Sequence, residues 1–466
     1  MAQRRSKSLL KGTLIYAIGN LGTKIITFLI VPLYTYYISP DDLGDYDLLV
    51  TTVALFTPII TLRISDAAYR WMLNGIKDKV DCISATYRVL IISSAAASFI
   101  ILLVNQFVPI AYYGYFILLL VCGRWLESLQ TLVRGLKKQS LFAASGIIYT
   151  VILVSLNIIK IIFLKEGIEA LFQSTVISQM ITIAVLLLCS RELRTGFHII
   201  PDSRRLTVEF LKYSAPLVPS GLSWWIMSAS DRYVIRAALG SSANGIFAIS
   251  SKFPAVVSMV FTIINFAWTD LALSDLKDNK ETSDYSSELF SNIYRIAISF
   301  TWILIPATNI VFSFVISATY QESAQYIGFL YLGAVFQGFT SFISAGLLKN
   351  AHTKRIARSS MIGAAVNLVV DLVAIQLIGL HAASLSTFLG FFVMWLLRMR
   401  DLNQVTPIRI NWKEAIATLI LSVLMIGATM NAGVAVNICL FIPAVVVFCV
   451  INRRIILSMY KAVMKK

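Results

Sequence analysis

The sequence predicts an all-α polytopic membrane protein with about fourteen transmembrane helices. The first reason is composition, because 58% of the 466 residues are hydrophobic and 14% are charged, whereas soluble domains carry roughly 25% charge. The second reason is the distribution of basic residues, which alternates from one connection between hydrophobic segments to the next. These features exclude the soluble globular, disordered and disulfide-rich secreted classes.

Each predicted span is a mainly apolar segment of about 20 residues, the length that crosses a bilayer as a helix. The segments lie near residues 12–38, 45–65, 83–105, 109–133, 141–164, 168–190, 213–238, 246–269, 289–316, 325–348, 359–378, 381–398, 414–431 and 433–452. The first segment follows a basic start that lacks a short apolar core with a small-residue cleavage site, so we expect an uncleaved first span.

The basic residues predict the orientation. Of the 40 Lys and Arg residues, 30 fall in alternate connections and only Lys165 falls in the others. Lys and Arg near helix ends concentrate on the cytoplasmic side, so both termini are expected in the cytoplasm. Topology, with anionic lipid headgroups as neighbours, therefore explains the net charge of +16, and nucleic acid is not expected as a partner. The cysteines show no CxxC spacing and are expected to pack as small apolar residues.

The chain also repeats itself weakly. Lys11 and Lys212 precede the first and seventh segments, and Gly167 and Gly379 precede the sixth and twelfth, with shifts of 201 and 212 residues. An even number of helices per repeat makes the repeats parallel, as in many transporters, where the site lies between the repeats. The expected parts are a six-helix lobe in 1–200, a second six-helix lobe in 201–405, and two additional helices with a basic tail in 406–466.

Several motifs carry a family resemblance. They are KGT at residues 11–13, GNLG at 19–22, ISPDDLGDY at 38–46, DRY at 231–233 and GIFAISSK at 245–252. Over residues 8–405 the chain resembles the polysaccharide-repeat-unit (O-antigen, Wzx-type) flippases of the multidrug/oligosaccharidyl-lipid/polysaccharide exporter superfamily. It departs from them at Ile246 and Phe247, where that family often has a pattern dominated by tyrosine.

The resemblance implies a function, a location and partners. The implied function is translocation of an undecaprenyl-diphosphate-linked oligosaccharide repeat unit from the cytoplasmic to the outer leaflet, by alternating access, for O-antigen, capsule or exopolysaccharide biosynthesis. The implied location is the bacterial cytoplasmic (inner) membrane. The implied partners are this lipid-linked oligosaccharide, membrane lipids, a polysaccharide polymerase and a chain-length regulator. No cofactor, metal or covalent chemistry is implied.

Nine basic residues lie within or at the edges of the hydrophobic segments, where charge is costly and usually functional. Lys24 and Arg124 lie near the middle of their segments, and Arg232 and Lys252 lie in the outer halves of theirs. A diphosphate that crosses the low-dielectric centre needs cationic side chains to offset its charge, and Arg grips a phosphate with two donors. We therefore expect these four residues to form a cationic substrate-binding cavity, which Arg63 extends toward the inner leaflet. The structural alternative is a set of ion pairs inside the helix bundle.

Two acidic residues are predicted to pair within a helix. Glu127 lies three residues after Arg124, and Asp66 lies three residues after Arg63. Residues at this spacing are neighbours on a helix surface. For Arg124 a pair with Glu127 is the structural alternative to a place in the cavity, and Arg63 either pairs with Asp66 or extends the cavity.

Two further acids are candidates for ion coupling. Adjacent residues of a helix do not face each other, so Asp231 and Arg232 are expected to serve different partners. Asp371 is the only acid in its segment and has no basic residue within one turn. It is either an ion-coupling site or the partner of Lys252.

The remaining basic residues of the segments lie near segment ends and are expected to snorkel to the interface. They are Arg88, Lys160, Arg236 and Arg295. Prolines inside the segments are expected to kink helices and to act as hinges. They are Pro58, Pro254 and Pro306.

Three other functions remain open from the residues. The nearest is a flippase of another lipid-linked glycan precursor, which the sequence does not exclude. A cation-coupled multidrug exporter of the same fold would need acidic residues in its cavity, whereas basic residues dominate the deep positions here. A membrane glycan polymerase or ligase would need a large charged outer loop, whereas the outer connections are short and nearly uncharged. No nucleotide-binding, metalloprotease or serine-hydrolase motif occurs, so we expect a transporter and not an enzyme.

Overall fold

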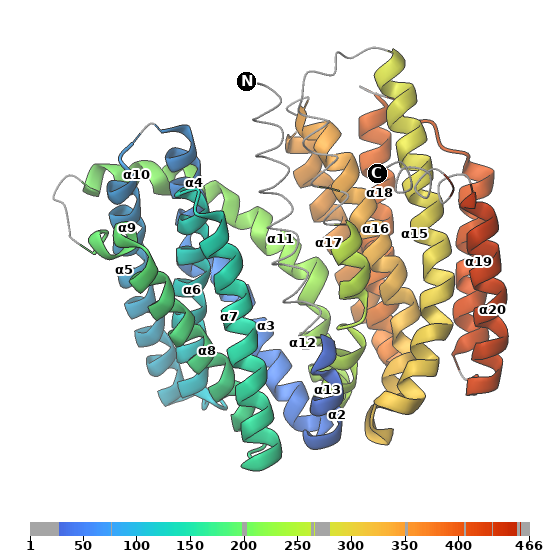
Figure 1. The fold of residues 1–466 in the computed structure, drawn as a ribbon, viewed down its shortest axis with the longest axis horizontal. Coiled ribbons are helices and arrows are strands. Elements are labelled where there is room, and N and C mark those ends of the chain that lie inside the picture. The colour runs from blue at the N-terminus through green and yellow to red at the C-terminus, as the bar shows by residue number, and fades with distance from the viewer. Residues whose placement is uncertain are drawn as a thin grey trace. The chain divides into compact units, whose positions relative to one another are not determined.

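The computed structural model describes residues 28–75, 77–197, 203–261, 280–349, 353–404, 407–430 and 432–453, together with the single residues 265 and 457. Throughout these ranges the regular structure is helical, without a strand (Figure 1). The predicted all-α class is therefore confirmed.

The helices of the first part of the chain follow the predicted segments closely. They are α2 Val31–Tyr37, α3 Pro40–Thr61, α4 Ile64–Asn74, α5 Lys79–Phe107, α6 Tyr113–Gly135, α7 Gln139–Ile158, α8 Ile168–Cys189, α9 Arg191–Thr195, α10 Ser203–Ser214 and α11 Val218–Ala229. A π-helical turn, Ile159–Phe163, continues α7.

The second part has a similar order, followed by an additional pair of helices. The elements are α12 Asp231–Leu239, α13 Ser241–Ser250, α15 Lys280–Val315, α16 Ala324–Lys349, α17 Thr353–Ile378, α18 Leu380–Asn403, α19 Trp412–Thr429 and α20 Val434–Ile451.

Eleven helices in the described ranges are long and apolar enough to cross a membrane, and a twelfth is obtained if a bent pair counts as one span. The pair is Ser241–Ser250 with Pro254–Phe261, bent by 42°. Each of these matches a predicted segment, so the chain is a multi-pass membrane protein. Of the two other predicted segments, 12–38 lies largely outside the described residues, and 213–238 is interrupted at Ser230 between α11 and α12. The number fourteen stays a prediction that is compatible with this structure.

The chain forms two compact units, residues 1–225 and 226–466. Unit 1 holds two apolar cores, one centred on α4, α5 and α6 and one that joins α3 to α6 and α8. Unit 2 has a core in which α12, α13, α16, α17 and α18 meet. Helix α10 packs on α4 and α5 of unit 1, so unit 1 continues past residue 200. The division into functional lobes at residues 200 and 405 stays a prediction.

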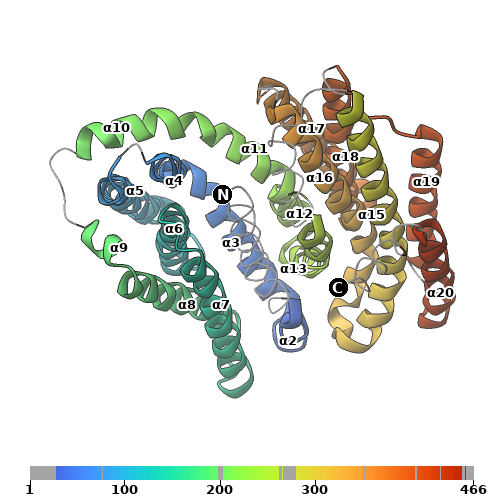
Figure 2. The ribbon, with the colours of Figure 1, turned by 45° about the horizontal axis from the view of Figure 1, so that its top comes forward.

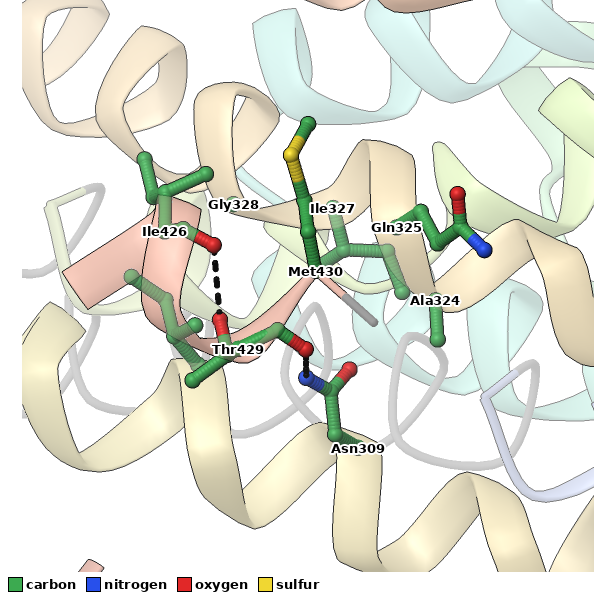
Figure 3. Close-up of a pocket in the computed structure, with 9 residues that line it drawn as sticks. Asn309, Ala324, Gln325, Ile327, Gly328, Ile426, Thr429 and Met430 are labelled. Atoms are coloured by element: carbon green, nitrogen blue, oxygen red, sulfur yellow. Dashed lines mark hydrogen bonds between the residues drawn. The ribbon is translucent and has the colours of Figure 1, made fainter. Parts of the chain in front are cut away.

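The additional helices α19 and α20 are attached to α15 by a ladder of polar contacts. Trp302 Nε1 donates to Ser422 Oγ at 2.7 Å, and Asn452 Nδ2 donates to Ser299 Oγ at 3.0 Å. Figure 3 shows the next rung, where Asn309 Nδ2 of α15 donates to the Thr429 carbonyl at 3.2 Å. Lipid tails are as apolar as leucine, so polar contacts and close packing hold membrane helices together. These polar contacts fix α19 and α20 to the rest of unit 2.

The strongest rung is an ion pair between Arg295 of α15 and Glu414 of α19. Arg295 Nε and Nη2 lie 2.5 and 2.9 Å from the two Glu414 oxygens. The expectation that Arg295 snorkels alone was therefore wrong, because its carboxylate partner comes from a helix about 120 residues later, beyond the reach of local spacing.

We expect this ion pair to contribute to the attachment of α19. In a double-mutant cycle with Arg295→Met and Glu414→Gln, the coupling free energy should be about 1 kcal/mol, the size found for polar contacts between membrane helices. Thermal unfolding of the four purified proteins in detergent measures it. Additive single effects would show that the contact contributes nothing.

A second ion pair, outside the membrane-spanning segments, joins the ends of α7 and α8. Lys138 Nζ lies 2.5 Å from Glu192 Oε2 and 3.2 Å from Ser190 Oγ. The hydrogen bond from Lys138 lowers the pKa of the Glu192 carboxyl from 4.5 to about 2. Unit 2 joins the ends of α17 and α18 in the same way, because Arg358 Nη2 lies 3.1 Å from Asp401 Oδ1.

The Glu192 pKa predicts a pH effect on stability. A carboxyl whose pKa is lowered by folding stabilises the fold above its unfolded pKa of 4.5, and this contribution is lost as the pH falls toward about 2. About a third of each side chain is exposed, so the expected contribution is about 1 kcal/mol or less. Thermal unfolding of wild type and Glu192→Gln should differ at neutral pH and converge below this window. A difference that persists at the acid end would assign the effect to packing.

Candidate functional site

Eight of the nine predicted site residues lie in the described part of the chain, and Lys24 lies outside it. Four of the eight belong to unit 1 and four to unit 2. Each unit is therefore described by itself.

Arg124 is a buried cation in the middle of α6. Its side chain is only 9% exposed, whereas that of Glu127 is 64% exposed. Their charged atoms lie 3.4 Å apart, which confirms the predicted pair. Nε and Nη1 of Arg124 nevertheless make no hydrogen bond to any described residue. A buried guanidinium with unused donors is costly. The single exposed carboxylate of Glu127 does not satisfy all of its donors, so Arg124 is suited to bind an anion.

A half-buried glutamine that packs on Gly123, the neighbour of Arg124 in the sequence, was not found by the sequence analysis. Gln179 of α8 packs on Gly123, where an added Cβ would lie 3.3 Å from the Gln179 amide nitrogen. Its Oε1 is buried without a hydrogen-bond partner among the described residues. Only the small glycine on α6 hints at this close approach, and a lone glycine in an apolar segment is too common to be a signal.

Arg63 lies at an abrupt corner between α3 and α4. Leu62 and Arg63 have φ angles of 46° and 53°, in the left-handed region. A residue other than glycine in this region costs about 1 kcal/mol or more of folding free energy, and such residues often lie at functional sites. Arg63 Nε bonds to Asp66 Oδ2 at 2.7 Å, so the predicted pair is confirmed. Both side chains stay more than a third exposed.

In unit 2, Asp231 and Arg232 form a buried ion pair. Arg232 Nη1 lies 2.7 Å from Asp231 Oδ1, with the side chains 11% and 3% exposed. The expectation that they serve different partners was wrong in excluding this contact. Asp231 is the first residue of α12 and its carboxylate also accepts from the Arg232 N–H, because the N–H groups at a helix start lack intrahelical partners. The Arg232 guanidinium also lies over the Phe247 ring, 5.1 Å from its centroid.

Asp371 of α17 joins this cluster. It is 1% exposed, and neither carboxylate oxygen has a hydrogen-bond partner in the described ranges. It lies within electrostatic range of Asp231 and Arg232. One turn earlier, Asn367 accepts from Ser230 at 3.4 Å and donates to Ser386 at 3.3 Å.

Asp371 is the member of this cluster whose carboxylate no described residue compensates by a hydrogen bond. A buried net charge is costly, and two carboxylates that share a site favour protonation or a bound cation. The cluster can therefore take up a proton or a monovalent cation, with Asp371 the carboxylate whose oxygens are unused. In the described ranges no group of three or more His, Cys, Asp or Glu side chains is arranged to hold a metal ion.

Lys252 lies at the bend between α13 and the helix Pro254–Phe261. It makes no ion pair with a described residue, so the expected pairing with Asp371 is not observed. Pro254 begins the second half of the bent span, as predicted for a kink, whereas Pro58 and Pro306 lie inside continuous helices. Arg63, Arg232 and Lys252 thus share a feature, since each lies at or next to an interruption of a helix. Substrate sites of membrane transporters are commonly built from discontinuous helices.

Two basic residues have local roles that the sequence analysis missed. Lys160 lies on the π-helical turn, 2.9 Å from Glu166 and 2.6 Å from Gln173, so it does not snorkel. Arg398 was counted with an inner connection but is 4% exposed, and its guanidinium binds only neutral oxygens. Its acceptors are Ser344, Ser359, Ser360 and the Thr340 carbonyl. A buried arginine without an acidic partner has no signature in the sequence.

Comparisons with known proteins agree with this architecture. The lipid II flippase MurJ, in an inward closed conformation, superposes with a TM-score of 0.68 at 12% identity, over 95% of this chain and 100% of that chain. An inward-facing multidrug resistance MATE transporter of the MOP superfamily gives 0.65 at 14%, over 84% and 98% of the two chains. An outward-facing MATE structure gives 0.60 at 13%, over 86% and 96%. No curated protein matches the chain in sequence.

The fold is therefore the one that these MurJ and MATE structures share. The model of the polysaccharide biosynthesis protein family matches residues 9–269, more than half of the chain. The chain belongs to the polysaccharide biosynthesis protein family.

Proposed function

We propose that the chain is a flippase for a polyprenyl-diphosphate-linked oligosaccharide repeat unit, which it moves from the cytoplasmic to the outer leaflet by alternating access. Membership of the polysaccharide biosynthesis family supports the pathway. The shared fold with a lipid II flippase supports a lipid substrate. An O-antigen, capsule or exopolysaccharide unit on undecaprenyl diphosphate is the substrate we propose.

The observation that carries the proposal is the buried guanidinium of Arg124. Its Nε has no partner among the described residues, and its Nη1 has only the exposed Glu127 carboxylate at 3.4 Å. Both nitrogens lie at mid-helix depth, where the charge of a crossing anion must be compensated. Arg63, in the same unit, adds a cation at a helix interruption. A diphosphate matches these donors by charge and by geometry, since a guanidinium binds phosphate oxygens through two parallel hydrogen bonds. Lys24 is proposed as a further cation of this set.

The Asp231–Arg232–Asp371 cluster is the proposed coupling site. Uptake of a proton or sodium ion balances the negative charge of Asp371, whose carboxylate oxygens have no hydrogen-bond partner among the described residues. Asn367 fixes the neighbouring hydroxyls. Because a polyprenyl diphosphate gains nothing from reaching the other leaflet by itself, an ion gradient acting on this cluster supplies the direction of transport.

The proposed setting follows from the same argument. The basic connections place both termini in the cytoplasm of a bacterial inner-membrane protein. A polysaccharide polymerase and a chain-length regulator are the proposed partners, since they act on the flipped unit. No covalent step is proposed, so the chain is not an enzyme.

One observation favours a second candidate, the cation-coupled multidrug exporter. MATE transporters share the fold, and the buried Asp371 offers an unpaired carboxylate. An organic cation, however, is repelled by Arg124, Arg63 and Lys252. A glycan polymerase or ligase has no support from the described loops.

Depletion of the chain in its native host tests the proposal. Polyprenyl-linked glycans are extracted, and a membrane-impermeant glycosidase applied to spheroplasts reports the leaflet that holds them. Accumulation of a complete single repeat unit on the cytoplasmic side is the expected result. Single units on the outer face would point to the polymerase, and unchanged glycans with a gain in drug sensitivity would point to the exporter.

A further inference from the structure

Helix α10 has a basic face that makes no ion pair. Its buried residues, Leu206, Thr207, Phe210 and Ser214, lie on the side that packs against α4 and α5. Arg204, Arg205 and Lys212 are exposed, and they fall within roughly 100° of each other around the helix, opposite the buried side. They pair with no carboxylate in the described part of the chain. Arg204, Arg205 and Lys212 together form the basic face of α10.

The neighbouring groups strengthen the positive charge. Arg191 and Arg194 of α9 are also exposed and unpaired among the described residues. The carboxylates nearby are engaged, since Glu192 binds Lys138 and Glu209 accepts from Trp71 Nε1 at 3.2 Å. Val208 lies between the three basic residues and is 48% exposed. Basic side chains that flank an exposed apolar one are typical of helices at a membrane surface.

The position of α10 fits a membrane interface. Figures 1 and 2 both show α10 running across the ends of α4 and α5, and not along the bundle. Trp71 packs on Phe210 and Tyr213 of α10, with ring centroids 5.3 and 5.2 Å apart. Trp and Tyr concentrate at the level of lipid headgroups. The basic connections place this end of unit 1 at the inner leaflet, where anionic lipids are found.

We propose that the basic face of α10, with Arg191 and Arg194, binds anionic phospholipid headgroups of the inner leaflet. Long Arg and Lys side chains reach sideways to phosphate oxygens, while the apolar side of the helix stays on α4 and α5. The bound lipid would hold α10, which leads directly into α11, in a fixed place. This surface is independent of the transported substrate.

Amide hydrogen exchange in residues 203–214 tests the proposal on the full chain. The protein is reconstituted in phosphatidylcholine vesicles and in vesicles with equal amounts of phosphatidylcholine and phosphatidylglycerol. Each of the three basic residues adds attraction to an anionic surface, so exchange should slow on the order of a hundredfold with phosphatidylglycerol. High salt should remove the difference, because it screens exposed charges.

Three variants locate the effect. The triple variant Arg204→Gln, Arg205→Gln, Lys212→Gln should exchange at the same rate in both vesicles. The charge-keeping variant Arg204→Lys, Arg205→Lys, Lys212→Arg should behave as wild type, which separates charge from misfolding. A matched control that removes the same charge from exposed positions of unit 2 should keep the lipid effect. It is Arg400→Gln, Lys413→Gln, Arg453→Gln.

Three results would overturn the proposal. The first is equal exchange of wild type in both vesicles. The second is loss of the lipid effect in the unit 2 control, which would assign it to net charge. The third is equal protection by inorganic pyrophosphate in phosphatidylcholine vesicles, which would assign the surface to a soluble phosphate or to the substrate's diphosphate. Failure of flipping in the host would leave these results unchanged, so the two proposals fail separately.

Discussion

Replacing Arg124 by glutamine should reduce translocation of the lipid-linked oligosaccharide by about tenfold to a hundredfold, because hydrogen bonds to charged groups contribute about 1.5–3 kcal/mol. The glutamine keeps the approximate size and a donor but removes the buried positive charge. Arg124→Lys should retain part of the activity, since a lysine supplies the charge without the two-donor geometry. Complementation of a depleted host, with the amount of protein in the membrane measured for each variant, gives the comparison.

Arg88→Gln is the matched control. Arg88 is a half-buried basic residue of α5 in the same unit, so the variant removes the same charge from another membrane helix. It should transport at close to the wild-type rate. A specific role for Arg124 in binding the diphosphate would be contradicted if Arg124→Gln translocated as fast as the wild type. It would also be contradicted if both variants lost the same fraction of the rate.

Replacing Asp371 by asparagine should uncouple transport from its driving ion. The amide is nearly the same size as the carboxyl group. It neither takes up a proton nor carries the negative charge that attracts a cation. With a proton or sodium gradient across the membrane, the rate should fall at least tenfold, or about 1.4 kcal/mol. Without a gradient, the variant and the wild type should transport at the same rate. Transport by reconstituted vesicles with and without each gradient measures both quantities.

Asp284→Asn is the control for Asp371. Asp284 is an exposed acid of α15, 4.0 Å from Arg409, and its loss should leave the gradient response intact. Asp371→Glu should keep part of the response because it keeps a carboxylate. If Asp371→Asn lowered the rate equally with and without a gradient, the residue would be structural.

The membrane architecture could be predicted from the sequence because it rests on simple physical limits. Apolar length and the placement of basic residues gave spans that match eleven helices and one bent pair. The buried position of Arg124 and the pairing of Arg63 with Asp66 also followed, since both depend on spacing along one helix. Such local geometry needs no knowledge of the neighbouring helices.

The interruptions of helices could be predicted only in part. Pro254 indicated the bend beside Lys252. The corner at Leu62 and Arg63 contains neither glycine nor proline, so nothing local indicates a left-handed backbone there. Helix α11 approaches this corner closely, because a Cβ added at Gly221 would lie 3.4 Å from Arg63 Nη1.

The partners of charged residues were the least predictable part. Arg295 meets Glu414, and Arg398 meets hydroxyl groups of α16 and α17, through contacts between segments far apart in the sequence. The direct pair of Asp231 and Arg232 depends on α12 beginning at Asp231 and not earlier in a continuous span. Tertiary structure therefore decided which cations are already satisfied and which, like Arg124, keep unused donors.

The most direct test of the central claim is translocation by the purified full chain. Vesicles are loaded with a polyprenyl-diphosphate oligosaccharide in both leaflets, and a membrane-impermeant glycosidase is added outside. With the chain present, we predict that nearly all of the glycan is cleaved, whereas vesicles without protein should stop at the fraction in the outer leaflet. With Arg124→Gln, cleavage of the remaining glycan should be about tenfold to a hundredfold slower than with the wild type. Cleavage that stops at the outer-leaflet fraction with a folded, correctly inserted wild-type chain would contradict the flippase.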